Sequence, residues 1–320
     1  MAEDIEIIVY GAAYFNIISR VPRLPRKGEK MVANEIKADF GGDTIFSGTV
    51  ANKLGARTAV VTKVGLDDNG KSFAEYMQSL DIDTTYLEIC RGQRTGIRQI
   101  NIGDNGQKHI ISIPGANILA TCVDIGSALE VFKNAKVLIC QQDLNLGSVI
   151  HALKTFKGIS ILDGVFIQNP PLDCIKEATY YCCSGEMAAR ILGVSKLLVV
   201  NDFVMALNKI LEMGAKIPII TVGLRGVVYV ETQETRSYIL VPLRPRSIRN
   251  LTNTGTGFVG ALAYYLAHFP NVSLQQKIGC AYEVTMFSGV VDENCGSDAC
   301  ELQIDPLKVV YPWRLLRSQY

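Results

Sequence analysis

Short apolar runs rich in β-branched residues alternate along the chain with segments that have helical periodicity. The apolar runs predict strands at Ile5–Tyr10, Thr58–Val64, Lys136–Cys140, Ile159–Leu162, Leu197–Val200, Ile217–Val222 and Val227–Glu231. The intervening periodicity predicts helices at Thr44–Leu54, Ser72–Leu80, Ser148–Thr155 and Phe203–Met213. This alternation is typical of an α/β fold, with a largely parallel sheet between two layers of helices. Ligands of such sheets bind beyond the carboxyl ends of the strands.

Two segments depart from this alternation and predict a second, smaller sheet. Glu29–Phe40 lacks helical spacing, and Thr95–Ile113 is typical of a β-hairpin whose turn is 104–106, Asp-Asn-Gly. We therefore expect a small β-sheet lid, formed by about residues 14–40 and 95–113, over the strand ends. No repeat or linker indicates a second independent domain, so residues 1–320 are expected to form a single domain with this inserted lid.

Composition and charge narrow the class of protein. Of the 320 residues, 48% are hydrophobic and 20% are charged, which excludes a disordered chain. The net charge of +1 indicates neither nucleic acid nor an anionic membrane as a partner. No apolar run reaches the ~18 residues of a membrane span, and the N-terminal segment lacks the basic region of a signal peptide. The nine cysteines are typical of buried thiols in a reducing compartment, so we expect a cytoplasmic protein.

Several glycine-containing turns are candidates for ligand contact. Gly41 and Gly42 precede a predicted helix, and Asp43 with Thr44 could cap that helix or bind sugar hydroxyls. The segments 114–117 (Pro-Gly-Ala-Asn) and 221–226 (Thr-Val-Gly-Leu-Arg-Gly) are each open to a similar choice between an ordinary turn and a ligand contact. Residues 250–262 enter an apolar helix through threonines and glycines, which is typical of an anion site at a helix start. The lysine of a Walker-type loop is absent there.

The order of these motifs resembles that of the ribokinase (PfkB) carbohydrate-kinase family. The resemblance runs from Ile7 to about Val291, and it includes 21–29 (Val-Pro-Arg-Leu-Pro-Arg-Lys-Gly-Glu) as the family's first segment. It implies a three-layer α/β/α ribokinase-like fold, ATP and Mg²⁺ as cofactors if the protein is active, and a sugar or nucleoside as substrate. Members of this family often dimerise through the edges of their lids, so the resemblance also implies a possible homodimer.

Several positions differ from the family pattern. The substrate-binding aspartate of the family falls on Asn16, the asparagine that ends the Gly-Gly motif falls on Phe46, and the acidic residue after the central strand is Asp143. The motif that organises Mg²⁺ and phosphate falls around Ser184, where its carboxylate positions hold glycine and methionine. These replacements change both the substrate site and the metal site.

The largest difference is at the catalytic motif. The two aspartates of the family motif fall on Asn250 and Thr256. A threonine hydroxyl is not basic at neutral pH, and the loss of a positioned general base typically costs about 10²–10⁴-fold in rate. No carboxylate lies near in sequence, because residues 227–282 contain only Glu231 and Glu234.

Two functions follow from these observations. The first is a pseudokinase that has kept the fold, lost catalysis and binds a small ligand or a protein partner. The alternative is an ATP-dependent sugar or nucleoside kinase with an atypical site, because phosphoryl transfer depends mostly on positioning and charge neutralisation. The expected site residues are Asn16, Gly41, Gly42, Asp43 and Asp143 for substrate, Ser184, Thr221, Gly223 and Gly226 for nucleotide, and Gly255 with Thr256 at the transferred phosphate; no metal ligand is identified.

Overall fold

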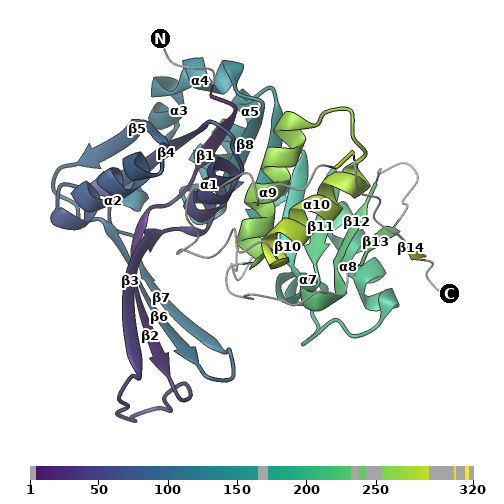
Figure 1. The fold of residues 1–320 in the computed structure, drawn as a ribbon, viewed down its shortest axis with the longest axis horizontal. Coiled ribbons are helices and arrows are strands. Elements are labelled where there is room, and N and C mark those ends of the chain that lie inside the picture. The colour runs from purple at the N-terminus through teal and green to yellow at the C-terminus, as the bar shows by residue number, and fades with distance from the viewer. Residues whose placement is uncertain are drawn as a thin grey trace.

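The computed structural model describes residues 5–164, 172–231, 238–242, 254–287, 306–307 and 314–316. Two sheets and two layers of helices make up the fold (Figure 1). Asn250 of the expected catalytic motif lies outside the described residues.

The main sheet has the strand order β14-β13-β12-β11-β10-β9-β8-β1-β4-β5. Its strands from β5 to β11 are parallel, and β12, β13 and β14 extend it in antiparallel fashion. The bounds are β1 (Ile7–Tyr10), β4 (Thr58–Gly65), β5 (Asp83–Cys90), β8 (Val137–Gln141), β9 (Ile159–Gly164), β10 (Tyr180–Ser184), β11 (Ile217–Thr221), β12 (Val227–Val230), β13 (Tyr238–Val241) and β14 (Arg314–Leu316). The central strands β1, β4 and β8 are buried along their whole length, because both faces of the sheet are covered.

Helices cover both faces of this sheet and form two hydrophobic cores. One core contains side chains of α1 (Asp43–Lys53), α2 (Asp68–Ser79), α9 (Thr254–His268) and α10 (Leu274–Phe287). The other contains side chains of α3 (Cys122–Ser127), α4 (Leu129–Asn134), α5 (Leu146–Thr155), α6 (Leu172–Ile175), α7 (Gly185–Leu192) and α8 (Val200–Glu212). The three-layer α/β/α architecture expected from the alternating pattern is therefore confirmed. Among the described residues, no helix combines the length and the apolar character that a bilayer crossing requires.

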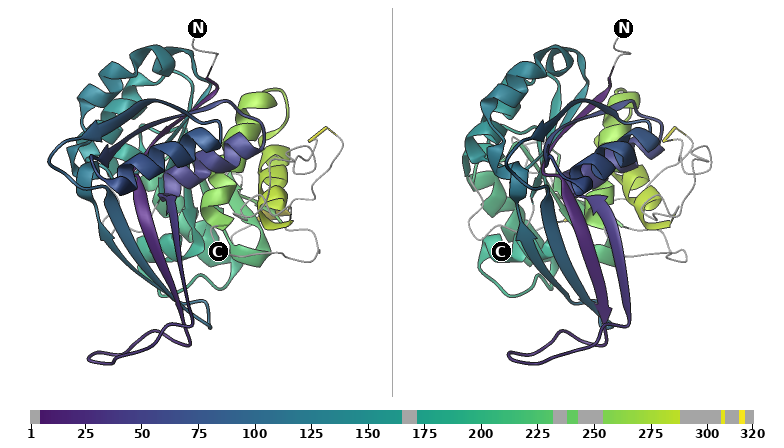
Figure 2. Two further views of the ribbon diagram at one scale, coloured as in Figure 1. Left: turned by 60° about the vertical axis from the view of Figure 1, so that its left-hand side comes forward. Right: turned by 90° about the vertical axis from the view of Figure 1, so that its left-hand side faces the viewer.

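A separate four-stranded sheet projects from one end of the main body (Figure 2). Its order is β3-β2-β6-β7, with bounds β2 (Tyr14–Val21), β3 (Glu35–Gly41), β6 (Gly96–Gly103) and β7 (Lys108–Ile113). The predicted hairpin is formed by β6 and β7, and Gly106 in its turn has a φ of 78°. We call this element the small sheet; it is the inserted β-sheet expected from the sequence.

One predicted strand is wrong. Residues Leu197–Val200 form no strand, and α8 begins at Val200. The reason is local, because the Asp202 carboxylate accepts hydrogen bonds from the backbone N–H groups of Leu198 and Val199 and so caps the helix. The strand at this place in the sheet is β10, whose sequence of two tyrosines, two cysteines and a serine lacks the β-branched residues that mark the other strands.

Candidate active site

Four neighbouring strands of the main sheet end at the same edge, and each brings one polar residue there. Asp143 follows β8, Asp163 lies near the end of β9, Ser184 ends β10 and Thr221 ends β11. The first turns of α1 and α9 reach the same edge, and these two helices pack against each other. This is the edge at which a parallel sheet is expected to bind its ligand.

A cavity of about 170 Å³ opens at this edge. It is lined by Asp43, Asp163, Gly164, Cys182, Cys183, Ser184, Thr221, Gly255, Thr256, Phe258 and Val259. The structure thus brings together five of the predicted site residues, from α1, β10, β11 and α9. Two carboxyl groups but no lysine or arginine occur among these lining residues.

The start of α1 needs a glycine in order to place Asp43. Gly42 precedes the helix with a φ of 138°, and a Cβ atom there would lie 1.9 Å from the carbonyl oxygen of Ala12. Glycine adopts this conformation readily, whereas L-residues rarely do. The side chain of Asp43 consequently lies in the first turn of the helix, where it lines the cavity.

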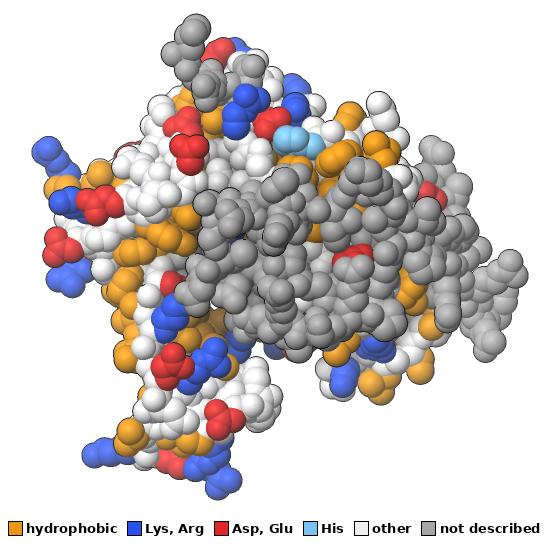
Figure 3. Space-filling model, viewed as in Figure 1, with side chains coloured by type: hydrophobic (Ala, Val, Ile, Leu, Met, Phe, Trp, Pro, Cys, Tyr) orange, Lys and Arg blue, Asp and Glu red, His pale blue; other side chains and the backbone are white. Residues whose placement is uncertain are grey.

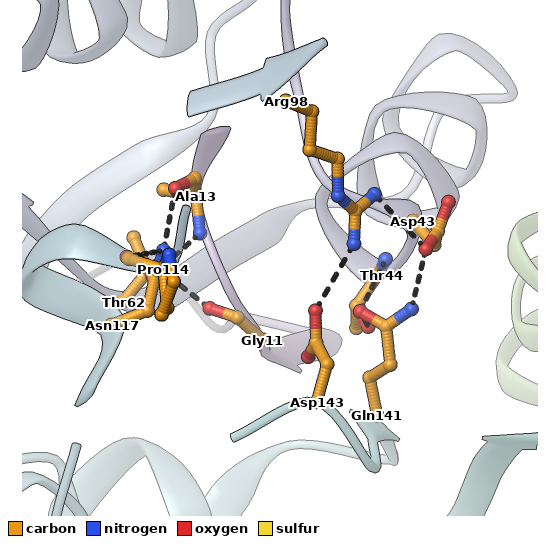
Figure 4. Close-up of polar contacts among 10 residues, drawn as sticks. All are labelled: Gly11, Ala13, Asp43, Thr44, Thr62, Arg98, Pro114, Asn117, Gln141 and Asp143. Carbon is orange, nitrogen blue, oxygen red and sulfur yellow. Dashed lines mark hydrogen bonds and ion pairs between the residues drawn. The ribbon is translucent and has the colours of Figure 1, made fainter. Parts of the chain in front are cut away.

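Arg98, which the sequence analysis did not identify, lies between two of the predicted substrate residues (Figure 4). Its Nη1 atom is 3.1 Å from Oδ2 of Asp43, and its Nη2 atom is 3.2 Å from Oδ2 of Asp143. The guanidinium carbon also lies 4.1 Å from the centre of the Tyr14 ring. Because Arg98 is on β6, these ion pairs connect the small sheet to α1 and to the end of β8. We call Arg98, Asp43 and Asp143 the ion cluster.

Three buried polar atoms around the ion cluster have no hydrogen-bond partner among the described residues. They are Oδ1 of Asn16, Nε of Arg98 and Oδ1 of Asp143. Asn16 lies opposite Arg98 in the small sheet, and it donates a hydrogen bond of 2.7 Å to Asp39. Buried polar groups are normally paired. These three atoms are covered by protein, and of the ion cluster only Asp43 lines the cavity.

Gln141 and Thr44 complete the polar network beneath the ion cluster. The Gln141 amide donates a hydrogen bond of 2.9 Å to Asp43, and the Thr44 hydroxyl donates one of 2.8 Å to Gln141 (Figure 4). Phe46, which stands where the family pattern has an asparagine, packs against the hydrophobic core. Asp43 is thus held on one side by the small sheet and on the other by the main sheet.

The side chain of Asn117 connects the small sheet to the main body (Figure 4). It accepts a hydrogen bond of 2.9 Å from the Ala13 backbone N–H, and it donates bonds of 2.8 Å to the carbonyl groups of Ala13 and Pro114. The predicted turn at 114–117 therefore fixes the position at which the chain passes from β1 of the main sheet to β2 of the small sheet.

The first turn of α9 has an open face at Gly255. A Cβ atom at Gly255 would find no heavy atom within 4 Å, so its backbone is accessible from the cavity. The carbonyl group of Thr256 accepts a hydrogen bond of 2.9 Å from the Ser47 hydroxyl, which ties α9 to α1. The position that the family resemblance assigns to the general base thus carries a neutral hydroxyl beside the cavity.

The expected nucleotide residues divide into two groups. Ser184 and Thr221 line the cavity, and the Ser184 hydroxyl also caps α7 by accepting a hydrogen bond of 3.2 Å from Met187. Gly223 and Gly226, in the turn η2 (Gly223–Arg225) and directly after it, are not among the lining residues. A Cβ atom at Gly226 would lie 2.1 Å from the carbonyl oxygen of Val241, so this glycine has a structural role in the turn.

The structure also supplies carboxylates that a search along the sequence could not find. Asp163 is far from Thr256 in the chain, yet both line the cavity, as does Asp43. The sequence feature that could have identified Asp163 is its position at the carboxyl end of a buried parallel strand. The signal for Arg98 is a cation within the otherwise uncharged strand β6. The expectation that no carboxylate lies near Thr256 thus holds for the sequence but not for the cavity.

The charges of the lining residues do not fit a nucleoside triphosphate. The open backbone at Gly255 would suit a phosphate group, but the Asp43 carboxylate would repel it and no lysine or arginine of the lining would attract it. Within the described part of the chain, no group of three or more His, Cys, Asp or Glu side chains could hold a metal ion. Among the described residues, the lining of the cavity therefore lacks the positive groups that would bind the phosphates of ATP.

Burial raises the pKa of Asp143 to about 7, and the nearby charge of Asp43 adds to this effect while Arg98 opposes it. Between about pH 4 and pH 7 the folded protein holds a proton that the unfolded chain releases, so stability falls as pH rises. Replacing Asp143 by asparagine should reduce this dependence, as measured by urea unfolding at about pH 5 and about pH 8, while the contribution of Asp163, whose pKa is also raised, remains. A slope in Asp143→Asn equal to that of the wild type would contradict the assignment. Asp173→Asn is the control, because Asp173 is exposed.

Comparisons with known proteins agree on one family. The model of the pfkB family of carbohydrate kinases matches residues 4–287. A ribokinase of Mus musculus is 30% identical over 283 residues, which cover 86% of each chain. Among solved structures, the ribokinase of Giardia lamblia has a TM-score of 0.81 at 15% identity, with coverage of 94% of this chain and 96% of that one. The Arabidopsis thaliana ribokinase complexed with ribose and ATP has a TM-score of 0.79 at 21% identity, with coverage of 95% and 97%.

Proposed function

Because the chain belongs to the pfkB family of carbohydrate kinases, we propose that it uses this fold to bind a small hydroxylated ligand and has lost efficient phosphoryl transfer. The observation that carries this proposal is Thr256, a neutral residue at the cavity where the family resemblance expects the general base. A hydroxyl with an ordinary pKa cannot accept the proton of an attacking alcohol.

The ion cluster supports the same proposal. Arg98 already binds both Asp43 and Asp143, two residues that were expected to contact substrate. A sugar would have to share or displace these ion pairs, and buried charges left unpaired are costly. Of the cluster only Asp43 lines the cavity, so a ligand bound there would contact the cluster through Asp43.

An ATP-dependent sugar or nucleoside kinase with an atypical site is the second candidate. It is favoured by the open backbone of Gly255 at the start of α9, where a phosphate would be bound. Such an enzyme would require Mg²⁺ to offset the carboxylates of the cavity.

The two candidates differ in one measurable product. We would titrate the full chain by calorimetry with a panel of pentoses, hexoses and nucleosides, with and without ATP and Mg²⁺, and follow ADP release in parallel. Ribose and ATP belong in the panel because the Arabidopsis ribokinase structure contains both. The proposal predicts binding of a small ligand without ligand-dependent ADP release. Saturable ADP release that depends on one sugar or nucleoside would contradict it and support the kinase.

Two further expectations concern assembly and location. The small sheet has apolar side chains at its surface (Figure 3), among them Ile36, Ile110, Ile111 and Ile113, which supports a homodimer formed through this sheet or a protein partner bound there. The seven described cysteines are free thiols and all but Cys122 are buried, which supports a reducing compartment such as the cytoplasm.

A further inference from the structure

The carboxyl group of Asp163 faces the cavity without a protein partner. Asp163 lies on β9 between Gln141 of β8 and Cys182 of β10. In the described part of the chain, its carboxyl group makes no hydrogen bond and no ion pair. Asp163 is half-buried, and a carboxyl group that is partly withdrawn from water without a protein partner favours a ligand that can pair with it.

The surroundings of Asp163 carry an excess of negative charge. The carboxyl groups of Asp43 and Asp143 act on it electrostatically. Arg98 is already bound to both of these aspartates. Lys108, at the start of β7, interacts electrostatically with Asp43 and with Glu186 of α7. If Asp43, Asp143 and Asp163 were all ionised, these three carboxylates would share Arg98 and the exposed Lys108.

The protein compensates for this excess by keeping protons. Burial, together with the charges of Asp43 and Asp143, raises the pKa of Asp163 well above its usual range. Cys182 and Cys183 add no charge, because burial also raises the pKa of both thiols. Entry of a positive group into the cavity would therefore favour the loss of a proton from Asp163.

The remaining lining and the size of the cavity limit what this group can be. Ser184, Thr221 and Thr256 contribute hydroxyl groups next to the two carboxyls. The cavity volume of about 170 Å³ is below the range of about 300–1,000 Å³ that is usual for larger ligands. These features fit a compact, hydroxylated molecule that carries one cationic group.

We propose that this cavity binds a small hydroxylated primary amine, whose ammonium group lies between the carboxylates of Asp43 and Asp163. The proposal rests on the function proposed above and names the class of its ligand. The three ammonium protons would be donated to these carboxylates and to a neighbouring hydroxyl. The hydroxyl groups of the ligand would meet the hydroxyls of Ser184, Thr221 and Thr256, which line the same cavity.

Matched pairs of probes test this proposal by calorimetry on the full chain. We would compare 2-amino-1,3-propanediol with glycerol and D-glucosamine with D-glucose. In each pair the amine should bind at least about tenfold more tightly. Titrations in two buffers that differ in ionisation enthalpy should show net proton release, because the ammonium group ionises Asp163.

Asp163→Asn should abolish both the preference for the amine and the proton release. Asparagine has nearly the same shape and no charge, so the variant should fold, and its urea unfolding verifies this. Asp173→Asn removes an exposed carboxylate and should leave binding unchanged. These two variants separate a local effect of the cavity from a change in net charge.

Three outcomes would overturn the proposal. They are equal or tighter binding of the neutral probes, absence of binding by both amines, and displacement of the amine by MgCl₂ alone or by ATP with Mg²⁺. The last outcome would identify the carboxylates as metal ligands. Phosphorylation of a bound amine would leave this inference intact and contradict the loss of phosphoryl transfer, so the two failures are distinguishable.

Discussion

Replacing Arg98 by methionine is expected to lower the free energy of unfolding by about 3–5 kcal/mol at about pH 7.5. The side chains of Arg98 and Asp143 are 11% and 17% exposed, so the variant would leave Asp143 buried without its counterion and would also remove the partner of Asp43. Methionine preserves most of the apolar contact with Tyr14. Chemical unfolding followed by circular dichroism gives the measurement.

The control for Arg98 lies in the same small sheet. Arg20 forms an ion pair with Glu35 in which the side chains are 58% and 62% exposed, and such pairs contribute at most about 1 kcal/mol. Arg20→Met should therefore change stability little. The deficit of Arg98→Met should also shrink at about pH 5, where Asp143 is protonated in both proteins. A loss as small as that of Arg20→Met at pH 7.5 would mean that the ion cluster does not hold the small sheet.

Replacing Gly260 by alanine is expected to destabilise the protein by about 3 kcal/mol, the upper end of the usual cost of overpacking. A Cβ atom at Gly260 would lie 2.0 Å from the carbonyl oxygen of Ser47, where α9 packs on α1. The obstacle is backbone, so one of the two helices must move. Because α1 carries Asp43 and α9 carries Thr256, ligand binding should weaken as well.

Gly255→Ala tests the same helix without the clash. No heavy atom lies within 4 Å of a Cβ atom at Gly255. Its unfolding free energy should equal that of the wild type or exceed it slightly, because alanine favours a helix. Its methyl group would enter the cavity and should reduce ligand binding. Equal stability of the two variants would show that α1 and α9 adjust to each other more freely than their contact indicates.

The alternation of strands and helices carries most of the information about the fold in this sequence. Strands such as β1 and β8 are almost entirely apolar, because the sheet is covered on both faces. The pattern fails around β10 and at residues Leu197–Val200. There, buried tyrosines and cysteines form a strand, whereas a capping aspartate converts an apolar run into the start of a helix.

The candidate site is less accessible from sequence because its contacts are distant along the chain. The family resemblance identifies Asp43, Asp143 and Thr256 through local motifs. Arg98 and Asp163 belong to no motif. They reach the site only because β6 of the small sheet brings Arg98 to Asp43 of α1 and because β9 lies beside β8 in the main sheet. A single sequence provides the residue types, while the topology decides which of them meet.

The ion cluster also gives the attachment of the small sheet a particular response to heat. The cost of removing water from charged groups decreases as temperature rises, because their hydration has a strongly negative entropy. The ion pairs of Arg98 therefore oppose detachment of the small sheet relatively better in warm solution than in cold. On heating, the sheet should remain docked until the main body melts, so that both are lost in a single cooperative transition. On cooling, this anchor weakens first, and amide hydrogen exchange in β6 and β2 should become faster relative to that of the main sheet.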